Sequence, residues 1–367
     1  MTRALRNAWD ALWGRGEYSV TVPPMDGALR PNTALDDAET LLEAEDVDNL
    51  MIHDGRLYFT QGTKLQLLGA VGEAPGTVAD FSSDISATAI SVSGSIAIAL
   101  DEGKLLLAPS PSEVANATAL SLGGKTAFVT ALAFDAKGDL FICVGSKVHR
   151  PSQWKRDLMT REFTGSVWLL AKGAAHAVML DDRLAFPNGI GFLADETPVI
   201  SEAWKHRLLK RTPAGKWTPF MLDLPGYPGR IASSGDGGLW LCVFAPRSQM
   251  IEFVLREKLY RKRMIERIDE QYWVAPAMRS GKSFKEPLQG GGVKHLGIRK
   301  PWGPTRSYGL VVRFDSDGLP TGSHHSRSDG NRHGITSAVE WDGKTVVASK
   351  GDGALIALVD SSLAGVA

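Results

Sequence analysis

Cysteine is scarce in this sequence: 367 residues contain only Cys143 and Cys242. So few thiols exclude the disulfide-dense scaffolds on which small secreted domains depend. Each cysteine stands inside a short apolar run, residues 141–144 and 240–243. We therefore expect two buried free thiols and a reducing compartment.

Charge of one sign is also absent, because 41 Lys and Arg balance 41 Asp and Glu. A chain without net charge has no global field that would attract nucleic acid or an anionic membrane. We expect neither of these as a partner. A small neutral or zwitterionic molecule fits the composition better.

Long apolar runs and cofactor motifs are missing as well. Residues 1–16 alternate charges with Trp9 and Trp13, which predicts a short amphipathic helix or tail and neither a secretory signal nor a membrane span. The cytoplasm is therefore the expected location. The glycines at 290–292 lack the flanking strand and helix of a phosphate site. The histidine pair His324 and His325 has no further potential ligands near it at the spacing of a metal site. No organic cofactor is expected.

A repeat of about forty residues is the main feature that is present. In each copy a short apolar run leads through a turn into a second apolar or aromatic run, as in 48–59 and 130–141. The copies begin at positions 48, 88, 130, 188, 229 and 336. Four-stranded propeller blades have this period, because one blade cannot bury its own apolar face without its neighbours.

Two spacings exceed the period because they contain insertions, a polar stretch at 147–163 and a longer segment at 245–304. Without these 17 and 60 residues the spacings of 58 and 107 become 41 and 47, within the period of roughly 40–50 residues that propeller blades have. The sequence thus predicts an all-β protein, a single six-bladed β-propeller domain over residues 1–367. The two cysteines fall in blades three and five, which do not touch in a six-membered ring.

The insertion at 245–304 belongs to blade five and has helical spacing of apolar residues from 248 to 268, with Ser248 as N-cap. We expect this helix either to cover one mouth of the channel as a lid or to form an interface, in which case the chain is a homodimer instead of a monomer. Its basic residues are interpreted as a solvated helix face balanced by acids.

Several segments resemble one known family. Residues 163–168, 181–182, 186–190, 201–202 and 206–211 are similar to the middle of the gluconolactonase and strictosidine synthase superfamily. Two further pairs of segments resemble the strictosidine synthase-like branch in particular: residues 224–228 with 236–240, and residues 334–340 with 342–343. The resemblance implies a six-bladed propeller with its active site in the central channel.

The resemblance also implies a calcium or other divalent cation, held by a first-blade carboxylate, asparagines of blades three and four, and a fifth-blade aspartate. The matching positions are Asp48, Thr130, Asn188 and Gly229. Asp48 and Asn188 keep ligating oxygens, whereas Gly229 beside Arg230 replaces the family aspartate. Calcium prefers six to eight oxygens, so the departure weakens the site.

The resemblance to this branch also implies a reaction that joins an amine to an aldehyde. Enzymes that carry out this reaction use a glutamate in the last blade. Thr336 stands at the matching position and cannot act as that base. Glu340 matches a different, structural glutamate of the branch.

The first residues of the innermost strands are expected to form a polar ring around the channel. The proposed substrate-binding residues are Arg230, Asn188, Thr130, Thr88, Thr336 and Trp204, and the proposed catalytic residues are His333, Glu202 and Asp48. Arg230 would bind a carboxylate or an oxyanion, and His333 or Glu202 would transfer protons. The alternative is that Asp48 and Arg230 pair across the channel and only stiffen it.

These residues favour hydrolysis of a small polar metabolite, with lactonase-like chemistry in the channel. Two alternatives remain open, a binding propeller without catalysis and carbon–nitrogen bond chemistry of the strictosidine type.

Overall fold

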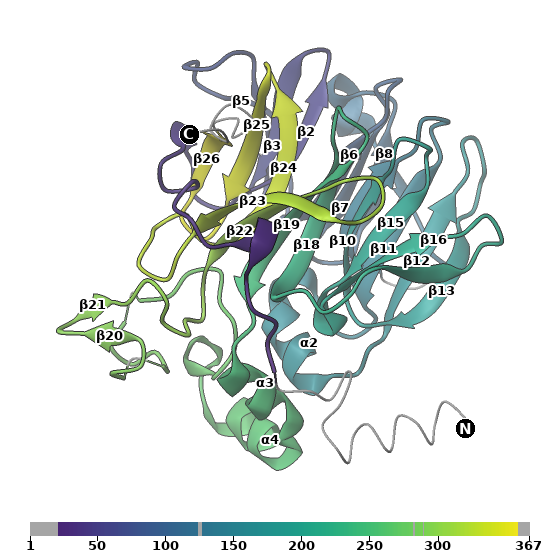
Figure 1. Ribbon diagram of the computed structural model, residues 1–367. Coiled ribbons are helices and arrows are strands. Elements are labelled where there is room, and N and C mark those ends of the chain that lie inside the picture. The colour runs from purple at the N-terminus through teal and green to yellow at the C-terminus, as the bar shows by residue number, and fades with distance from the viewer. Residues whose placement is uncertain (1–20, 124–126, 282, 289, 359–367) are drawn as a thin grey trace.

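The computed structural model describes residues 21–123, 127–281, 283–288 and 290–358. Six four-stranded antiparallel sheets stand side by side around an axis, which confirms the predicted six-bladed β-propeller (Figure 1). The innermost strand of each blade contacts the innermost strands of both neighbouring blades, so that the six form a closed ring. The predicted N-terminal helix or tail at 1–16 lies outside the described residues.

The first three blades use consecutive strands. Blade one is β2 (Val47–His53), β3 (Arg56–Gln61), β4 (Lys64–Leu68) and β5 (Gly76–Asp80); blade two is β6 (Ile85–Ile90), β7 (Ile96–Leu100), β8 (Leu105–Ala108) and β9 (Thr118–Leu120); blade three is β10 (Phe128–Phe134), β11 (Leu140–Ser146), β12 (Gly165–Leu170) and β13 (Val178–Leu184).

The last three blades include an interruption and the ring closure. Blade four is β14 (Pro187–Phe192), β15 (Pro198–Glu202), β16 (Arg207–Arg211) and β17 (Trp217–Met221); blade five is β18 (Gly226–Ser233), β19 (Leu239–Pro246), β22 (Gly309–Phe314) and β23 (Pro320–Ser326); blade six is β24 (Ile335–Trp341), β25 (Lys344–Ser349), β26 (Ala354–Leu358) and β1 (Glu39–Glu43).

The ring closes through β1, which precedes blade one in the chain but pairs with β26, the last strand. Glu39 lies opposite Ala357 and Glu43 opposite Ala354 in this antiparallel pair. The closing strand joins the two ends of the repeat array, so the edge that an open array would expose is paired.

Turn chemistry explains why the repeat folds as hairpins. In blade three, Oδ1 of Asp135 accepts hydrogen bonds from the backbone N–H of Lys137 at 3.0 Å and of Asp139 at 2.8 Å. Gly138 completes the turn with φ of +88°, a conformation that side chains other than glycine rarely adopt. The apolar runs on either side then pair as β10 and β11.

The core lies between blades and not within one. For example, Leu140 of β11 and Ala99 of β7 belong to one buried cluster, although they come from blades three and two. At the centre the packing is tight: a Cβ added at Gly189 on β14 would lie 2.1 Å from the Gly229 oxygen on β18. Only glycine allows these inner strands to approach so closely.

The insertion in blade five contains α3 (Gln249–Arg256), α4 (Lys258–Arg267), the 3₁₀ turn η6 (Glu270–Tyr272) and a small hairpin, β20 (Lys294–His295) with β21 (Ile298–Arg299). The predicted N-cap is confirmed, since Ser248 Oγ accepts from the Ile251 N–H at 3.3 Å. The expected single helix is two, because Glu257 has a non-helical ψ of 81°.

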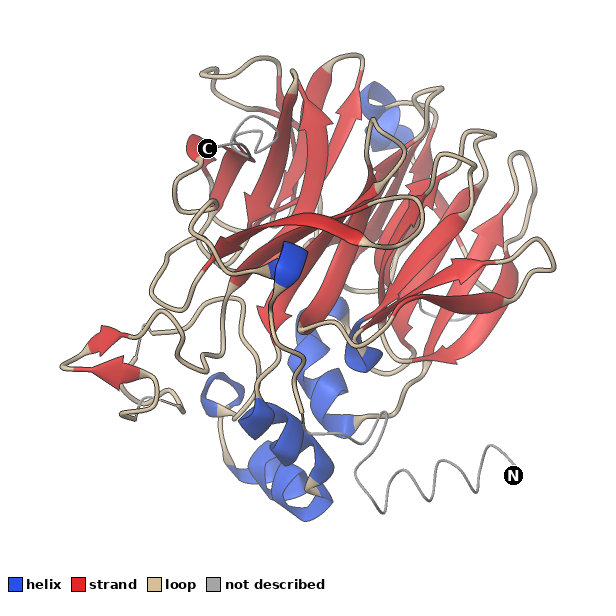
Figure 2. Cartoon of the chain, viewed as in Figure 1, coloured by secondary structure: helices blue, strands red, loops and turns tan. Residues whose placement is uncertain are grey.

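A second helical region arises where the sequence suggested only a polar stretch. Between β11 and β12 the chain forms the 3₁₀ turn η4 (Pro151–Gln153) and α2 (Trp154–Thr160), and Leu158 and Met159 of α2 are buried. Figure 2 shows α2, α3 and α4 gathered on one side of the sheets. The remaining short 3₁₀ turns are η2 (Gly27–Leu29), η3 (Pro111–Asn116) and η5 (Ala203–Lys205).

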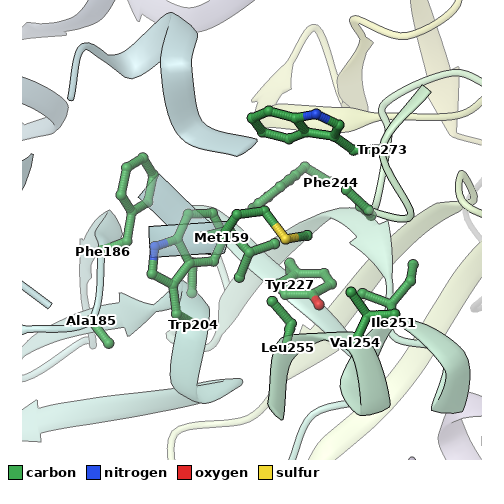
Figure 3. Packing of buried hydrophobic residues seen from close by; sticks show 14 of the residues in the cluster. Met159, Ala185, Phe186, Trp204, Tyr227, Phe244, Ile251, Val254, Leu255 and Trp273 are labelled. Atoms are coloured by element: carbon green, nitrogen blue, oxygen red, sulfur yellow. The ribbon is translucent and has the colours of Figure 1, made fainter. Parts of the chain in front are cut away.

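The helices are attached to the propeller by one aromatic cluster, shown in Figure 3. Ile251, Val254 and Leu255 of α3 pack with Trp204 of blade four and Phe244 of blade five. The insertion therefore shares its core with two blades. Among the helices the structure describes, none is long and apolar enough to cross a membrane.

Both cysteines are free and buried, as expected. Burial raises the pKa of each thiol well above its ordinary value. These thiols therefore act as small apolar core residues and not as nucleophiles.

Candidate functional site

The beginnings of the innermost strands converge on an axial cavity of about 280 Å³. Asp48, Thr130, Asn188, Arg230 and Thr336 line it, so the structure brings together five of the residues expected in the ring. They come from blades one, three, four, five and six. The cavity lies on the side of the propeller that carries the helices, since Trp154 of α2 and Met278 of the insertion form part of its wall.

A charged cluster occupies the centre of this cavity. The buried carboxylate of Asp48 lies 2.8 Å from Arg230 Nη1 through Oδ1 and 3.2 Å from Lys350 Nζ through Oδ2. Burial would raise the pKa of the Asp48 carboxyl, but the charges of Arg230 and Lys350 outweigh burial, and the pKa lies below its ordinary value. Asp48 is therefore an ionised anchor for two cations.

Arg230 also spans the channel through backbone contacts. Its Nη2 donates to the Ser86 oxygen of blade two at 2.7 Å, and its Nη1 lies 3.4 Å from the Thr336 oxygen of blade six. The side chains of Arg230 and Lys350 nevertheless remain 20% and 29% exposed. Both cations can therefore reach a ligand while Asp48 holds them.

The other ring positions are more constrained. The Thr130 hydroxyl donates to the Pro187 oxygen at 2.5 Å and lies 3.3 Å from the Cys143 oxygen, which joins blades three and four. Gly229 lines the cavity with backbone alone. Asn188 is half-buried at the wall and is available to orient a polar ligand.

These residues do not fit the calcium ion that the family resemblance implies. Both oxygens of Asp48 face cationic side chains, Gly229 supplies no carboxylate, and the Thr130 hydroxyl is directed to backbone oxygens. Within the described residues, no group of three or more His, Cys, Asp or Glu is arranged to hold a metal. Arg230 and Lys350 place positive charge at Asp48 by themselves.

The cavity contains acids and aromatics that sequence reasoning missed. Asp46 and Asp84 line it as exposed carboxylates, and Asp101 accepts from Ser152 N–H at 2.7 Å and Ser152 Oγ at 2.8 Å. The apolar wall is Trp154, Phe186, Phe244 and Met278. Most of these residues lie in connections outside the repeated pattern, so the repeat gave no signal for them.

Glu202 and Trp204, proposed for catalysis and substrate binding, lie outside the cavity wall. Glu202 is fully buried; Oε1 accepts from the Ala185 N–H at 2.7 Å, and Oε2 lies 2.5 Å from Arg207. Trp204 stacks on Phe186 with ring centroids 4.5 Å apart and donates to Asp157 at 2.8 Å. In this geometry both residues hold the turn after β15.

His333 and Thr88 are likewise not part of the cavity wall. The His333 ring lies 2.9 Å from Ser307 Oγ through Nδ1 and 2.8 Å from the Arg327 oxygen through Nε2. Burial lowers the pKa of His333. Both nitrogens are engaged, so His333 connects the base of the insertion to blade six. Thr88 is buried within β6.

Glu340, expected to be structural, is held by Ser234 Oγ at 2.9 Å, Gly235 N–H at 3.0 Å and Trp240 Nε1 at 3.1 Å. It is not part of the cavity, where Thr336 stands at the position for which the family resemblance implies the acid of strictosidine-type chemistry. The geometry gives that chemistry no carboxylate at this position.

The sequence was compared with those of known proteins. No protein-family model matches the chain. Adipocyte plasma membrane-associated protein of Rattus norvegicus is 26% identical over 288 residues, 69% of this chain and 75% of the relative. The protein of the same name from Danio rerio is 24% identical over 345 residues, 84% of this chain and 81% of the relative.

Solved structures share the fold. A gluconolactonase from Xanthomonas campestris matches with a TM-score of 0.57 and 14% identity, over 92% of this chain and 96% of its own. A calcium-binding protein, regucalcin, from Agrobacterium tumefaciens matches with a TM-score of 0.53 and 16% identity, over 88% and 92%. At such identities the likeness concerns the propeller itself.

Proposed function

The chain belongs to the superfamily of six-bladed β-propellers that contains the strictosidine synthase-like proteins and the gluconolactonases, and we propose that it hydrolyses a small polar metabolite, in a lactonase-like reaction, within the axial cavity. The reaction would need no metal ion, because Arg230 and Lys350 supply the positive charge at Asp48.

The cluster of one acid and two cations is the observation that carries this proposal. Hydrolysis of an ester or lactone develops negative charge on the carbonyl oxygen. Arg230 and Lys350 are anchored by Asp48, so their charge is directed into the cavity before a ligand arrives. A preorganised cation stabilises the oxyanion without reorganising at the moment of reaction.

The attacking water would be oriented by a carboxylate other than Asp48. Both Asp48 oxygens contact cations, and the lowered pKa makes this carboxylate a weak base. Asp46 and Asp84 line the same cavity and are exposed. Trp154 and Phe244 would cover the apolar part of the substrate.

The test is turnover of sugar lactones, homoserine lactones and aryl esters with chelator or with added calcium. We expect hydrolysis that the chelator leaves unchanged. Arg230→Met should lower kcat/KM by about 100-fold, the typical effect of losing an oxyanion-stabilising group. Arg56→Met, which changes an exposed arginine at the start of β3, is the matched control. Activity that appears only with calcium would contradict the metal-free reaction.

A second candidate function is ligand binding without catalysis. It is favoured by the saturation of Asp48, since the acid at the cavity centre has no oxygen left for proton transfer. In that case the wild-type protein would bind a ligand and release it unchanged. The Arg230→Met variant would lose this binding, which calorimetry measures. Product formation by the wild-type protein would reject this alternative.

A further inference from the structure

The insertion of blade five is strongly basic although the whole chain is neutral. Residues 245–304 contain 13 Lys and Arg but only 6 Asp and Glu, so the remaining chain carries an equal excess of acids. The net charge of zero, which suggested no charged partner, conceals this separation of basic and acidic residues along the chain. A local excess of this size creates a field over one part of the surface.

Much of this charge is exposed and unneutralised. Arg256, Lys258, Arg263 and Arg267 are exposed on α3 and α4, and none has an ion-pair partner within the described part of the chain. Lys262 lies 3.8 Å from Glu266, and both are exposed. Exposed pairs of this kind contribute little energy and leave the charge accessible.

Large apolar side chains are exposed in the same segment. Leu259 is 73% exposed on α4, and Leu296 and Trp302 are 90% and 78% exposed in and after the β20–β21 hairpin. The other exposed apolar residues of the insertion are Met250, Phe253, Tyr260, Ile268, Phe284 and Ile298. Soluble monomers rarely expose so many large apolar groups in one region without a partner.

The exposed residues are carried by elements that project from one end of the propeller. Figure 1 shows α3, α4 and the β20–β21 hairpin beyond the edge of the sheets on the side of α2. The buried face of α3, with Ile251, Val254 and Leu255, is already packed on the blades. The exposed groups are therefore left over after the insertion has folded onto its own core.

We propose that the insertion docks reversibly on an anionic lipid surface. Interleaved basic and large apolar side chains fit a bilayer interface, where lysine and arginine meet phosphate groups while tryptophan and leucine enter the acyl boundary. A symmetric interface between two copies would bring two basic faces together. A nucleic acid would leave Leu296, Ile298 and Trp302 without apolar contacts.

Docking in this way would place the cavity beside the membrane. Met278 of the insertion and Trp154 of α2 both form part of the cavity wall. The docking residues are not among those that line the cavity, so docking and ligand chemistry can fail separately.

The experiment is flotation of the full-length protein with vesicles of phosphatidylcholine or of equimolar phosphatidylcholine and phosphatidylserine. We expect binding to the anionic vesicles that weakens as salt increases. The double variant K262Q/R263Q should bind about 30-fold more weakly, from two lost basic contacts. L296S/W302S should also bind more weakly, at any salt concentration.

The matched control is K137Q/K216Q, which removes the same charge from exposed turns after β10 and β16. These turns lie at the opposite end of the propeller, because both strands run away from the cavity. Equal loss of binding in the control would overturn the proposal. It would also be overturned by a stable dimer that ignores vesicles, or by binding to a DNA duplex in place of lipid.

Discussion

Asp48 illustrates how neighbouring side chains decide what a carboxylate can do. Its position on the first inner strand predicted a metal ligand or a catalytic residue that positions water, but the structure surrounds it with Arg230 and Lys350. Pairing across the channel, considered from the sequence, is what the structure contains. Lys350 comes from the turn after β25 and carried no signal in the repeat.

Replacing Asp48 by asparagine keeps the shape but removes the charge. We expect Asp48→Asn to lower the free energy of unfolding by about 2–3 kcal/mol, because two partly buried cations lose their counter-charge. Urea unfolding measures the change. Asp342→Asn, in an exposed turn with φ of 50°, is the control and should differ little from the wild type.

A second prediction at this scale concerns His325. Its ring lies between Tyr308 Oη at 3.1 Å and Ser323 Oγ at 2.7 Å, and burial together with His324 lowers its pKa to about 4. The unfolded side chain takes up its proton near the ordinary value of about 6.5. Protonation therefore favours the unfolded state, and stability is lost as the pH falls from about 6.5 toward 4.

Chemical unfolding at pH 7 and pH 4 tests this reasoning. Between these values the wild type should lose about 3 kcal/mol more than His325→Gln, because only the wild type retains this buried imidazole. His295→Gln, at an exposed position of the insertion, should keep the wild-type dependence. Identical pH profiles for the wild type and His325→Gln would show that another group controls acid stability.

At the scale of elements, the insertion is the part that sequence reasoning described least completely. Apolar spacing from 248 to 268 predicted a helix and its cap, and both are present. The burial of Leu158 and Met159 of α2 depends on packing against blades four and five, through Trp204 and Phe244. Local propensity contains no information about that contact.

The N-cap of α3 gives the prediction for this scale. Ser248→Ala removes the acceptor for the Ile251 N–H and should cost about 1 kcal/mol of stability. Ser248→Asn retains a capping oxygen, so its loss of stability should be only a small part of that of Ser248→Ala. Thermal unfolding compares the two, and equal losses would mean that residue 248 matters for a reason other than capping.

At the scale of the whole molecule, β1 closes the ring by pairing with β26, the last strand of blade six. Deleting residues 1–43 leaves β26 as an open edge and removes the cover from apolar side chains of β26 itself, among them Ile356. We expect a lower urea midpoint and a broader transition, because blade six loses its outer strand.

A synthetic peptide covering residues 35–45 should restore part of the lost stability when added in excess, through the same antiparallel register. A peptide with the same residues in scrambled order is the control. An unchanged midpoint in the deletion variant would show that the ring does not depend on this closure.

The sequence by itself determined the architecture, since turn residues such as Asp135 and Gly138 and a forty-residue apolar period are local properties that each blade repeats. It also determined that Asp48, Thr130, Asn188, Arg230 and Thr336 meet, because a closed ring brings equivalent positions to one axis. Only the tertiary structure decided which groups complete the cavity and which do not. Lys350, Asp84 and Trp154 enter it from connections between the strands, whereas the side chains of His333 and Glu202 make buried hydrogen bonds elsewhere. The physical reason is that side-chain direction in such connections is set by packing between distant segments, which no local pattern encodes.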